Sequence, residues 1–194
     1  MKKFVLLYLA LLFIVIRCDS GTVNPTETAQ RKFVELPADS ALGDTTRFDN
    51  YYMMHGSYGS TIQFNRQFTG GPFGQFGISA TLTIEAGTIA ASDSLLCLLS
   101  VNIENTSVSI SPIKNYFAHP FKLTLKYNGL DLQNLDLDDL QFVNTDEKNV
   151  IIDVKYDSIT MNYVTGSLEI VNAVIIYDPR IGSDSKYGWV RNPQ

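Results

Sequence analysis

The residues whose side chains are best suited to binding or catalysis lie together in FDNYYMMHGSYG, residues 48–59. Tyr51, Tyr52 and Tyr58 surround His55 there, and exposed tyrosines would form an aromatic platform for a sugar or a partner protein. The competing interpretation is that these side chains plug one end of a folded core, because large apolar residues are usually buried. We expect the plug, and we name these four residues as the candidate binding residues.

Other reactive patterns in the chain lack the spacing that chemistry requires. His55 and His119 are far apart in the sequence, without the clustered companions that a metal site needs. In HGSYGS, residues 55–60, the glycines and serines do not have the Gly-x-Ser-x-Gly spacing of the nucleophile elbow of a serine hydrolase. The glycine-rich segment 70–77 lacks the Gly-Lys-Ser/Thr ending of a phosphate loop and reads as a bend between strands. The sequence therefore predicts no catalytic residue, no metal and no cofactor.

An acidic stretch, LDLQNLDLDDL, covers residues 130–140. Asp136 and Asp138 alternate as calcium ligands do, but the Gly and the closing Glu of a calcium loop are missing. We expect a solvated loop, with an adventitious calcium site as the alternative. The stretch also motivates an alternative function, a secreted polysaccharide-active enzyme with carboxylates borne on loops. That enzyme would need two carboxylates facing each other across a groove lined by Tyr51, Tyr52 or Tyr58.

The N-terminal segment has the layout of a signal peptide. Lys2 and Lys3 precede an unbroken apolar run over residues 4–16, which is shorter than the about 20 residues of a membrane span. This pattern predicts export from the cytoplasm. The protein would then be an outer-membrane or cell-surface lipoprotein, or else periplasmic or secreted.

Cys18 follows the apolar run directly and is the candidate lipidation site. The position resembles the end of a lipoprotein signal peptide, although Arg17 stands where Gly, Ala or Ser is usual. The alternative is ordinary cleavage after Ser20. We favour a lipid on Cys18, which would make the membrane one partner of the chain. Cys97, within a run of leucines, is interpreted as a buried core residue.

Downstream of residue 60 the chain alternates between apolar and polar residues, as one-sided antiparallel strands do. The alternating segments are residues 75–87, 121–127, 149–156 and 158–163, whereas residues 94–101 are apolar on both faces and predict a central strand. Turn signals at Asn128-Gly129 and Thr165-Gly166 predict hairpins. The fold class is therefore all-β, an antiparallel β-sandwich of about eight strands, because a lone sheet would leave an apolar face in water.

The composition of the chain and the order of its segments give further expectations. The 194 residues carry a net charge of −5, which argues against a nucleic-acid partner. We expect a signal peptide over residues 1–18, an extended tether over 19–48, the sandwich over 49–180 and a C-terminal tail over 181–194. The predicted function is that of a non-enzymatic binding or structural domain of the cell envelope, with an unknown protein or carbohydrate partner.

The middle of the chain resembles ZU5-type β-domains over roughly residues 68–177. The resemblance rests on the glycine pair Gly70-Gly71, the amphipathic strand that follows, and the turn at residues 85–88. It also includes Phe117 and Pro120 ahead of an alternating strand. Some ZU5-containing proteins cleave themselves at a His-Phe-Ser motif, but Ile176, Tyr177 and Asp178 occupy those positions here. The resemblance therefore implies an interaction or structural module without autoproteolysis.

Overall fold

The structure is a computed structural model, and it describes residues 32–39, 45–145, 151–182 and 185–191. The expected signal peptide, Cys18 and the tether up to residue 31 lie outside the described residues. Within the described part, the only helical element is a 3-10 turn, η1 (Leu137–Asp139), which is capped by the Asp136 side chain. None of the described residues forms a helix that is long and apolar enough to span a membrane.

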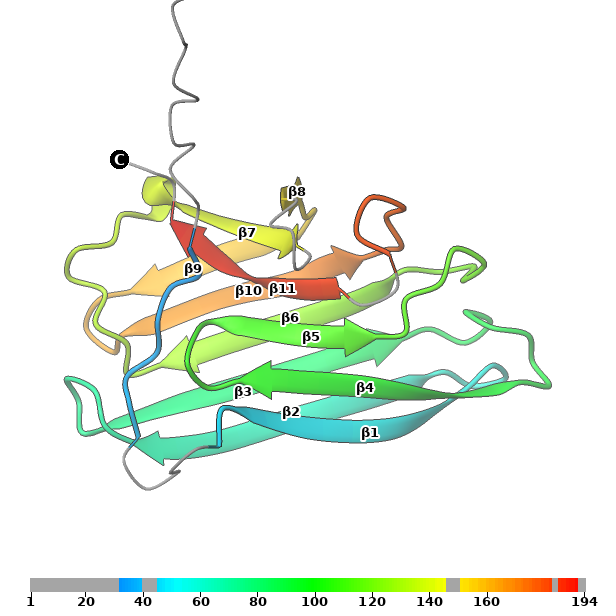
Figure 1. Cartoon of the computed structure of the whole chain (residues 1–194), viewed down its shortest axis with the longest axis horizontal. Coiled ribbons are helices and arrows are strands. Elements are labelled where there is room, and N and C mark those ends of the chain that lie inside the picture. The colour runs from blue at the N-terminus through cyan, green and yellow to red at the C-terminus, as the bar shows by residue number, and fades with distance from the viewer. Residues whose placement is uncertain (1–31, 40–44, 146–150, 183–184, 192–194) are drawn as a thin grey trace, which may run out of the picture. The chain divides into compact units, whose positions relative to one another are not determined.

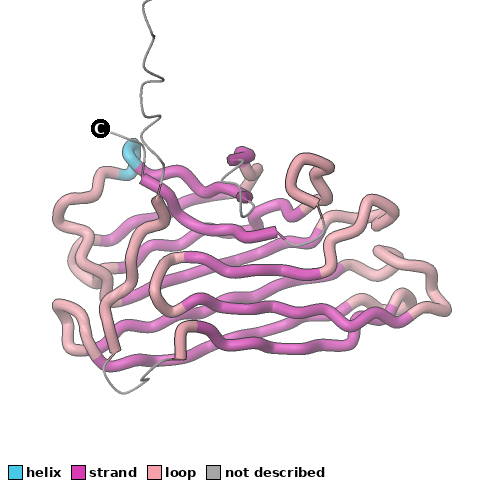
Figure 2. The backbone as a smooth tube through the Cα atoms, in the orientation of Figure 1, coloured by secondary structure: helices cyan, strands magenta, loops and turns pink. Residues whose placement is uncertain are grey.

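The fold is a sandwich of two antiparallel sheets, which confirms the predicted fold class (Figures 1 and 2). The six-stranded sheet has, in spatial order, β1 (Arg47–His55), β4 (Ser94–Asn102), β5 (Ser107–Ser111), β11 (Ser185–Arg191), β7 (Leu140–Thr145) and β8 (Ile151–Asp153). The five-stranded sheet has β2 (Ser60–Thr69), β3 (Gln75–Ile84), β6 (Phe121–Asn128), β10 (Ser167–Ile175) and β9 (Ser158–Asn162). The described residues thus form eleven strands rather than about eight.

Period-two alternation places one apolar row of each strand in the space between the sheets. Along β6, Phe121, Leu123, Leu125 and Tyr127 are buried and alternate with half-buried polar residues. The opposite sheet contributes Cys97, Leu99 and Val101 from β4. As predicted, β4 is a central strand, because β1 and β5 flank it.

The glycine-rich segment 70–74 is the turn between β2 and β3, as the sequence predicts. The Gly70 N–H donates to the Gly74 carbonyl at 3.1 Å, and Gly71 has a φ of 71°, which glycine adopts most readily. The Thr165-Gly166 signal likewise joins β9 to β10 in a hairpin. The prediction of a hairpin at Asn128-Gly129 is wrong, because β6 pairs with β3 and β10, and the next strand, β7, belongs to the other sheet.

The expected C-terminal tail is instead a strand in the middle of the larger sheet. β11 lies between β5 and β7, and Trp189 on it is completely buried, with its ring 5.3 Å from that of Phe142. The sandwich therefore extends to Arg191, beyond the expected limit at residue 180. The physical reason is the large apolar area of Tyr187 and Trp189, both of which are buried in the core.

Part of the expected tether also belongs to the sandwich. Residues 32–36, which we call the strap, lie beside the part of β11 that extends past its pairing with β5. The Val34 N–H donates to the Trp189 carbonyl at 2.9 Å, and the Thr106 N–H donates to the Val34 carbonyl at 2.8 Å. Leu36 enters the core. The domain therefore begins by Lys32 rather than at residue 49, because these backbone bonds and Leu36 fix the strap to it.

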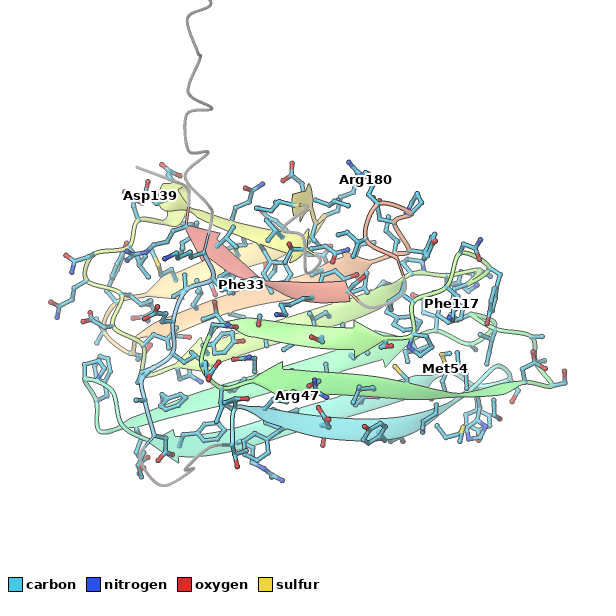
Figure 3. All side chains as sticks on the ribbon, viewed as in Figure 1. Phe33, Arg47, Met54, Phe117, Asp139 and Arg180 are labelled. Carbon is cyan, nitrogen blue, oxygen red and sulfur yellow. The ribbon has the colours of Figure 1, made fainter. Side chains whose placement is uncertain are left out.

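The two ends of the sandwich differ. Lys32 enters beside Arg191, whose N–H donates to the Lys32 carbonyl at 3.2 Å, and we call this the entry end. The opposite end carries the connections 56–59, 85–93 and 112–120 together with residues 176–182, and we call it the loop end. β1 runs from the entry end to the loop end, with Arg47 and Met54 near its two extremities (Figure 3).

Candidate functional site

The predicted aromatic cluster is divided between β1 and the turn that leads into β2. Two glycines allow that turn to pack against the β3–β4 connection. A Cβ on Gly56 would lie 2.0 Å from the Ala90 carbonyl oxygen, and Gly59 has a φ of 68°. The Gly56 N–H donates to the Asp93 carbonyl, and the Gly87 N–H donates to the Gly56 carbonyl. The HGSYG stretch is thus held by backbone bonds at the loop end.

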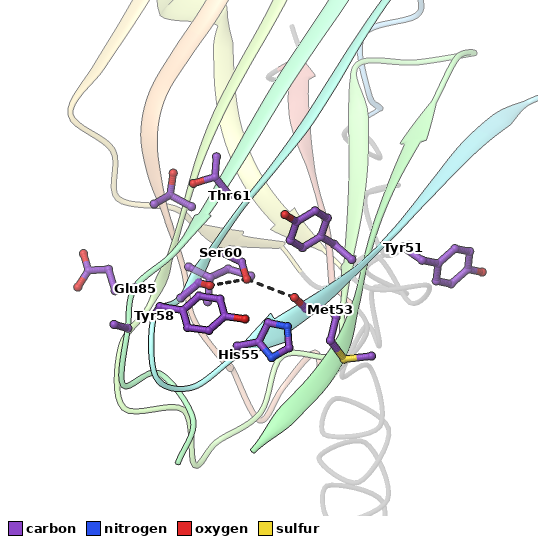
Figure 4. Close-up of a pocket in the computed structure, with 12 residues that line it drawn as sticks. Tyr51, Met53, His55, Tyr58, Ser60, Thr61 and Glu85 are labelled. Atoms are coloured by element: carbon purple, nitrogen blue, oxygen red, sulfur yellow. Dashed lines mark hydrogen bonds between the residues drawn. The ribbon is translucent and has the colours of Figure 1, made fainter. Parts of the chain in front are cut away.

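A groove of about 810 Å³ lies at this place, between the edge of β1 and the start of β2 (Figure 4). The residues that line it are Tyr51, Tyr52, Met53, His55, Tyr58, Gly59, Ser60, Thr61, Thr83, Ile84, Glu85 and Ala86. All four candidate binding residues therefore line one groove. The lining combines tyrosine rings with the hydroxyl groups of Ser60, Thr61 and Thr83, a composition that suits ligands with both apolar and polar faces.

His55 and Tyr58 form the centre of the groove. Their ring centroids are 4.9 Å apart, and Figure 4 shows the two rings side by side. His55 Nδ1 lies 2.8 Å from the Ser94 hydroxyl on β4, a hydrogen bond that fixes the imidazole orientation. The Ser60 hydroxyl donates to the Gly59 carbonyl at 2.6 Å and lies 3.4 Å from the Met53 carbonyl. This wall of the groove is therefore pre-organised.

The expected plug is wrong, because the tyrosines of the cluster face solvent. Tyr58 is 70% exposed, Tyr51 61% and Tyr52 46%, whereas Met54 is buried in the core. β1 is an edge strand, so the open side of the sandwich leaves Tyr52 half uncovered even though it shares the inward face with Met54. Tyr51 points away from His55 and Tyr58 (Figure 4). The cluster is thus an exposed aromatic surface, which was the competing interpretation.

Glu85 is the carboxylate in the groove wall. Lys122 on β6 donates a hydrogen bond to it at 2.7 Å and thereby holds the pKa of Glu85 below its usual range. The same contact raises the pKa of Lys122. Their charges cancel at the rim, so the groove offers little net charge to a ligand.

This lining does not meet the condition set for the polysaccharide-active enzyme. Among the described residues, Glu85 alone contributes a carboxylate to the groove wall, and Lys122 occupies it. The acidic stretch lies elsewhere, in the connection between β6 and β7 that contains η1, and the Asp138 N–H lies 3.4 Å from the Asp136 carboxylate that caps this turn. The pair of opposed carboxylates that the alternative function requires is therefore not formed at this groove.

The other chemically interesting residues are dispersed. His119 lines a separate hollow of about 200 Å³ at the loop end, together with Lys114 and Phe117. Within the described ranges, no three His, Cys, Asp or Glu side chains are placed to hold a metal ion. Cys97 is buried, and desolvation raises the pKa of its thiol to about 12, as expected for an inert core cysteine.

The sequence did not indicate Glu85, which lines the groove, or Ser94 and Lys122, which hydrogen-bond to His55 and Glu85. None of them lies near residues 48–59 in the sequence, and only the sheet pairing brings them there. The HGSYG glycines carry the one local signal, since a glycine on either side of an exposed turn indicates a close backbone approach. No protein-family model matches the chain, and no curated protein or solved structure is significantly similar to it.

Proposed function

We propose that this chain is an exported binding and structural domain of a bacterial cell envelope. A lipid on Cys18 would hold it at a membrane, and the groove of Tyr51, Tyr52, His55 and Tyr58 would bind an envelope carbohydrate or protein. The observation that supports this most is the solvent exposure of the three tyrosines, one of which, Tyr58, lies against an oriented imidazole. Their burial would have made the cluster part of the core.

The position of the groove on the sandwich supports its use as a binding surface. The chain enters the sandwich at Lys32, at the entry end. His55 is the last residue of β1, and Tyr58 follows it in the turn to β2 at the loop end, where β1 ends (Figure 1). The groove and the point at which a tether would join the sandwich therefore lie at opposite ends of the domain. A resemblance to ZU5-type domains, which would also imply an interaction module, stays a prediction.

The anchor is tested by supplying radiolabelled palmitate to cells that express the full chain. We expect label in the membrane fraction, loss of label in Cys18→Ser, and stronger labelling in Arg17→Gly, which restores the small residue usual before a lipidated cysteine. Protein retained in the cytoplasm would contradict export. Export without label would contradict the lipid anchor but not export, and it would favour cleavage after Ser20.

Binding is tested by co-sedimentation of the full chain with purified envelope polysaccharide and with protease-treated envelope. Tyr58→Ala should weaken the association about tenfold, equivalent to ~1.4 kcal/mol, because its ring is the most exposed in the groove. The matched control is Phe73→Ala, an aromatic that is 52% exposed in the β2–β3 turn. Equal retention of both variants would contradict the groove as the binding site. Loss of binding after protease treatment would indicate a protein partner.

A further inference from the structure

A second hollow lies beside the groove at the loop end. It has a volume of about 580 Å³ and is lined by the β3–β4 connection, the start of β4, and Tyr116 and Ala118 of the β5–β6 connection. The Ala118 N–H donates to the Thr88 carbonyl at 3.0 Å, which holds the two connections together. The Tyr116 ring meets the Phe117 ring edge to face at 5.3 Å, and Phe117 stacks on the buried Phe121. The hollow is therefore fixed to the core of the sandwich.

The hollow adjoins the groove along the β3–β4 connection. Residues 85 and 86 line the groove, and the next two residues line the hollow. Ser94 also lines the hollow, and its hydroxyl lies 2.8 Å from Nδ1 of His55, which lines the groove. Backbone bonds join the β3–β4 connection to the β1–β2 turn on one side and to the β5–β6 connection on the other (Figure 1). The two hollows therefore meet at the His55–Ser94 pair.

Each hollow presents one strongly exposed tyrosine. Tyr58 in the groove is 70% exposed, and Tyr116 in the hollow is 66% exposed. The exposed side chains of Ser92 and Ser94 add hydroxyl groups to the lining of the hollow. An aromatic ring in each of two adjoining hollows, with polar groups beside it, suits a chain of polar rings better than it suits a single ring.

The charges around the two hollows favour an uncharged ligand. Glu85 in the groove is already paired with Lys122. Asp93 contributes a carboxylate to the hollow, where it accepts a hydrogen bond from the Ser92 hydroxyl at 3.1 Å. Among the described residues that line either hollow there is no lysine or arginine. An anionic polymer would therefore lose hydration without gaining a basic side chain to pair with.

We propose that the groove and the hollow are two subsites for one extended ligand, a linear neutral polysaccharide that crosses the His55–Ser94 pair. One sugar ring lies against Tyr58, and another, farther along the chain, lies against Tyr116. A disaccharide uses the groove alone, since the His55–Ser94 pair separates the two tyrosines. This inference rests on the proposed binding function and names the class of its ligand.

The test is isothermal titration calorimetry of the full chain in a Cys18→Ser background, so that no lipid is attached. The probes are the neutral fraction of purified envelope polysaccharide and disaccharides released from it. Tyr116→Ala should raise the dissociation constant for the polymer about tenfold and leave that for the disaccharide unchanged. Unchanged disaccharide binding also shows that this variant is folded. The matched control is Tyr156→Ala, which should change neither constant, because Tyr156 is 44% exposed on the β8–β9 connection at the opposite edge of the sandwich.

Tyr58→Ala separates this inference from the proposed function, because it should weaken the binding of polymer and disaccharide alike. If it does so while Tyr116→Ala behaves like Tyr156→Ala, the two-subsite inference is overturned and the groove remains a binding site. A parent chain that binds neither probe overturns carbohydrate binding and the inference together. The anionic fraction of the same polysaccharide should bind at least about tenfold more weakly than the neutral fraction. Equal binding of the two fractions overturns the assignment of a neutral ligand.

Discussion

Individual residues of the sandwich differ sharply in what they contribute to stability. Gly188 on β11 has no space for a side chain, because a Cβ would lie 2.4 Å from the Thr106 carbonyl oxygen and 2.9 Å from the Phe33 ring. Gly77 on β3 has room, with its nearest neighbour at 3.5 Å. These two strand glycines therefore have different reasons to be glycine.

We expect Gly188→Ala to lower the free energy of unfolding by about 1–3 kcal/mol, because the added methyl collides with the Thr106 carbonyl and with the Phe33 ring of the strap. The matched Gly77→Ala should leave the unfolding midpoint unchanged or raise it slightly, since alanine limits the unfolded chain more than glycine does. Urea denaturation of both variants measures the difference. Equal midpoints would show that Thr106 and Phe33 do not approach Gly188 as closely as described.

Asp49 sets a pH dependence at the residue scale. Hydrogen bonds from Arg47 and then from Ser100 lower the pKa of its carboxyl. A depressed pKa in the folded state contributes stability above the unfolded pKa, and this contribution disappears as the pH falls through the folded value. Asp49→Asn should therefore lose less stability than the parent between pH 6 and pH 2. The difference should be below about 1 kcal/mol because the pair is partly exposed.

Thermal unfolding followed across that pH range measures this difference. The matched control is Asp178→Asn, because Arg180 similarly lowers the pKa of the Asp178 carboxyl at the loop end. Each variant should flatten the acid limb of the stability curve independently, since the two pairs lie on different elements. An acid limb that is unchanged in Asp49→Asn would contradict the assigned role of the Arg47 contact.

At the scale of elements, the strap is a part of the sandwich that the sequence assigns to the tether. Residues 32–36 show no sustained period, and their apolar side chains alone do not fix a place in the fold. That place depends on backbone bonds to Trp189 and Thr106, which are distant in the sequence, and on the burial of Leu36. The alternating segments were predictable because apolar residues at every second position directly indicate a strand with one buried face. β11 was missed because its pattern of burial is nearly continuous and it follows the Asp178-Pro179 break.

The strap predicts a difference between two neighbouring residues. Leu36→Ala should cost about 2–3 kcal/mol, because the Leu36 side chain is buried in the core. Glu35→Ala should change the free energy of unfolding by less than about 0.5 kcal/mol, since the Glu35 side chain is exposed and only its backbone pairs with Asn105. Chemical denaturation distinguishes them. Equal effects would mean that the strap is not anchored through Leu36.

At the scale of the whole molecule, the fold class followed from the sequence but the candidate site did so only in part. The four residues Tyr51, Tyr52, His55 and Tyr58 do lie around one groove. Their exposure could not be predicted, because it depends on β1 being an edge strand. The sheet order that makes β1 an edge is set by long-range pairing, which local alternation does not encode.

We propose that the domain lies outside the cytoplasm, where the exposed Tyr58 faces solvent. The most direct measurement of this location is labelling with a maleimide that cannot cross the inner membrane, applied to cells in which that membrane is intact. Tyr58→Cys in the Cys18→Ser background should react, while the Cys18→Ser parent should not, because Cys97 is buried and its pKa is raised to about 12. Labelling of Tyr58→Cys only after the cells are lysed would contradict the account.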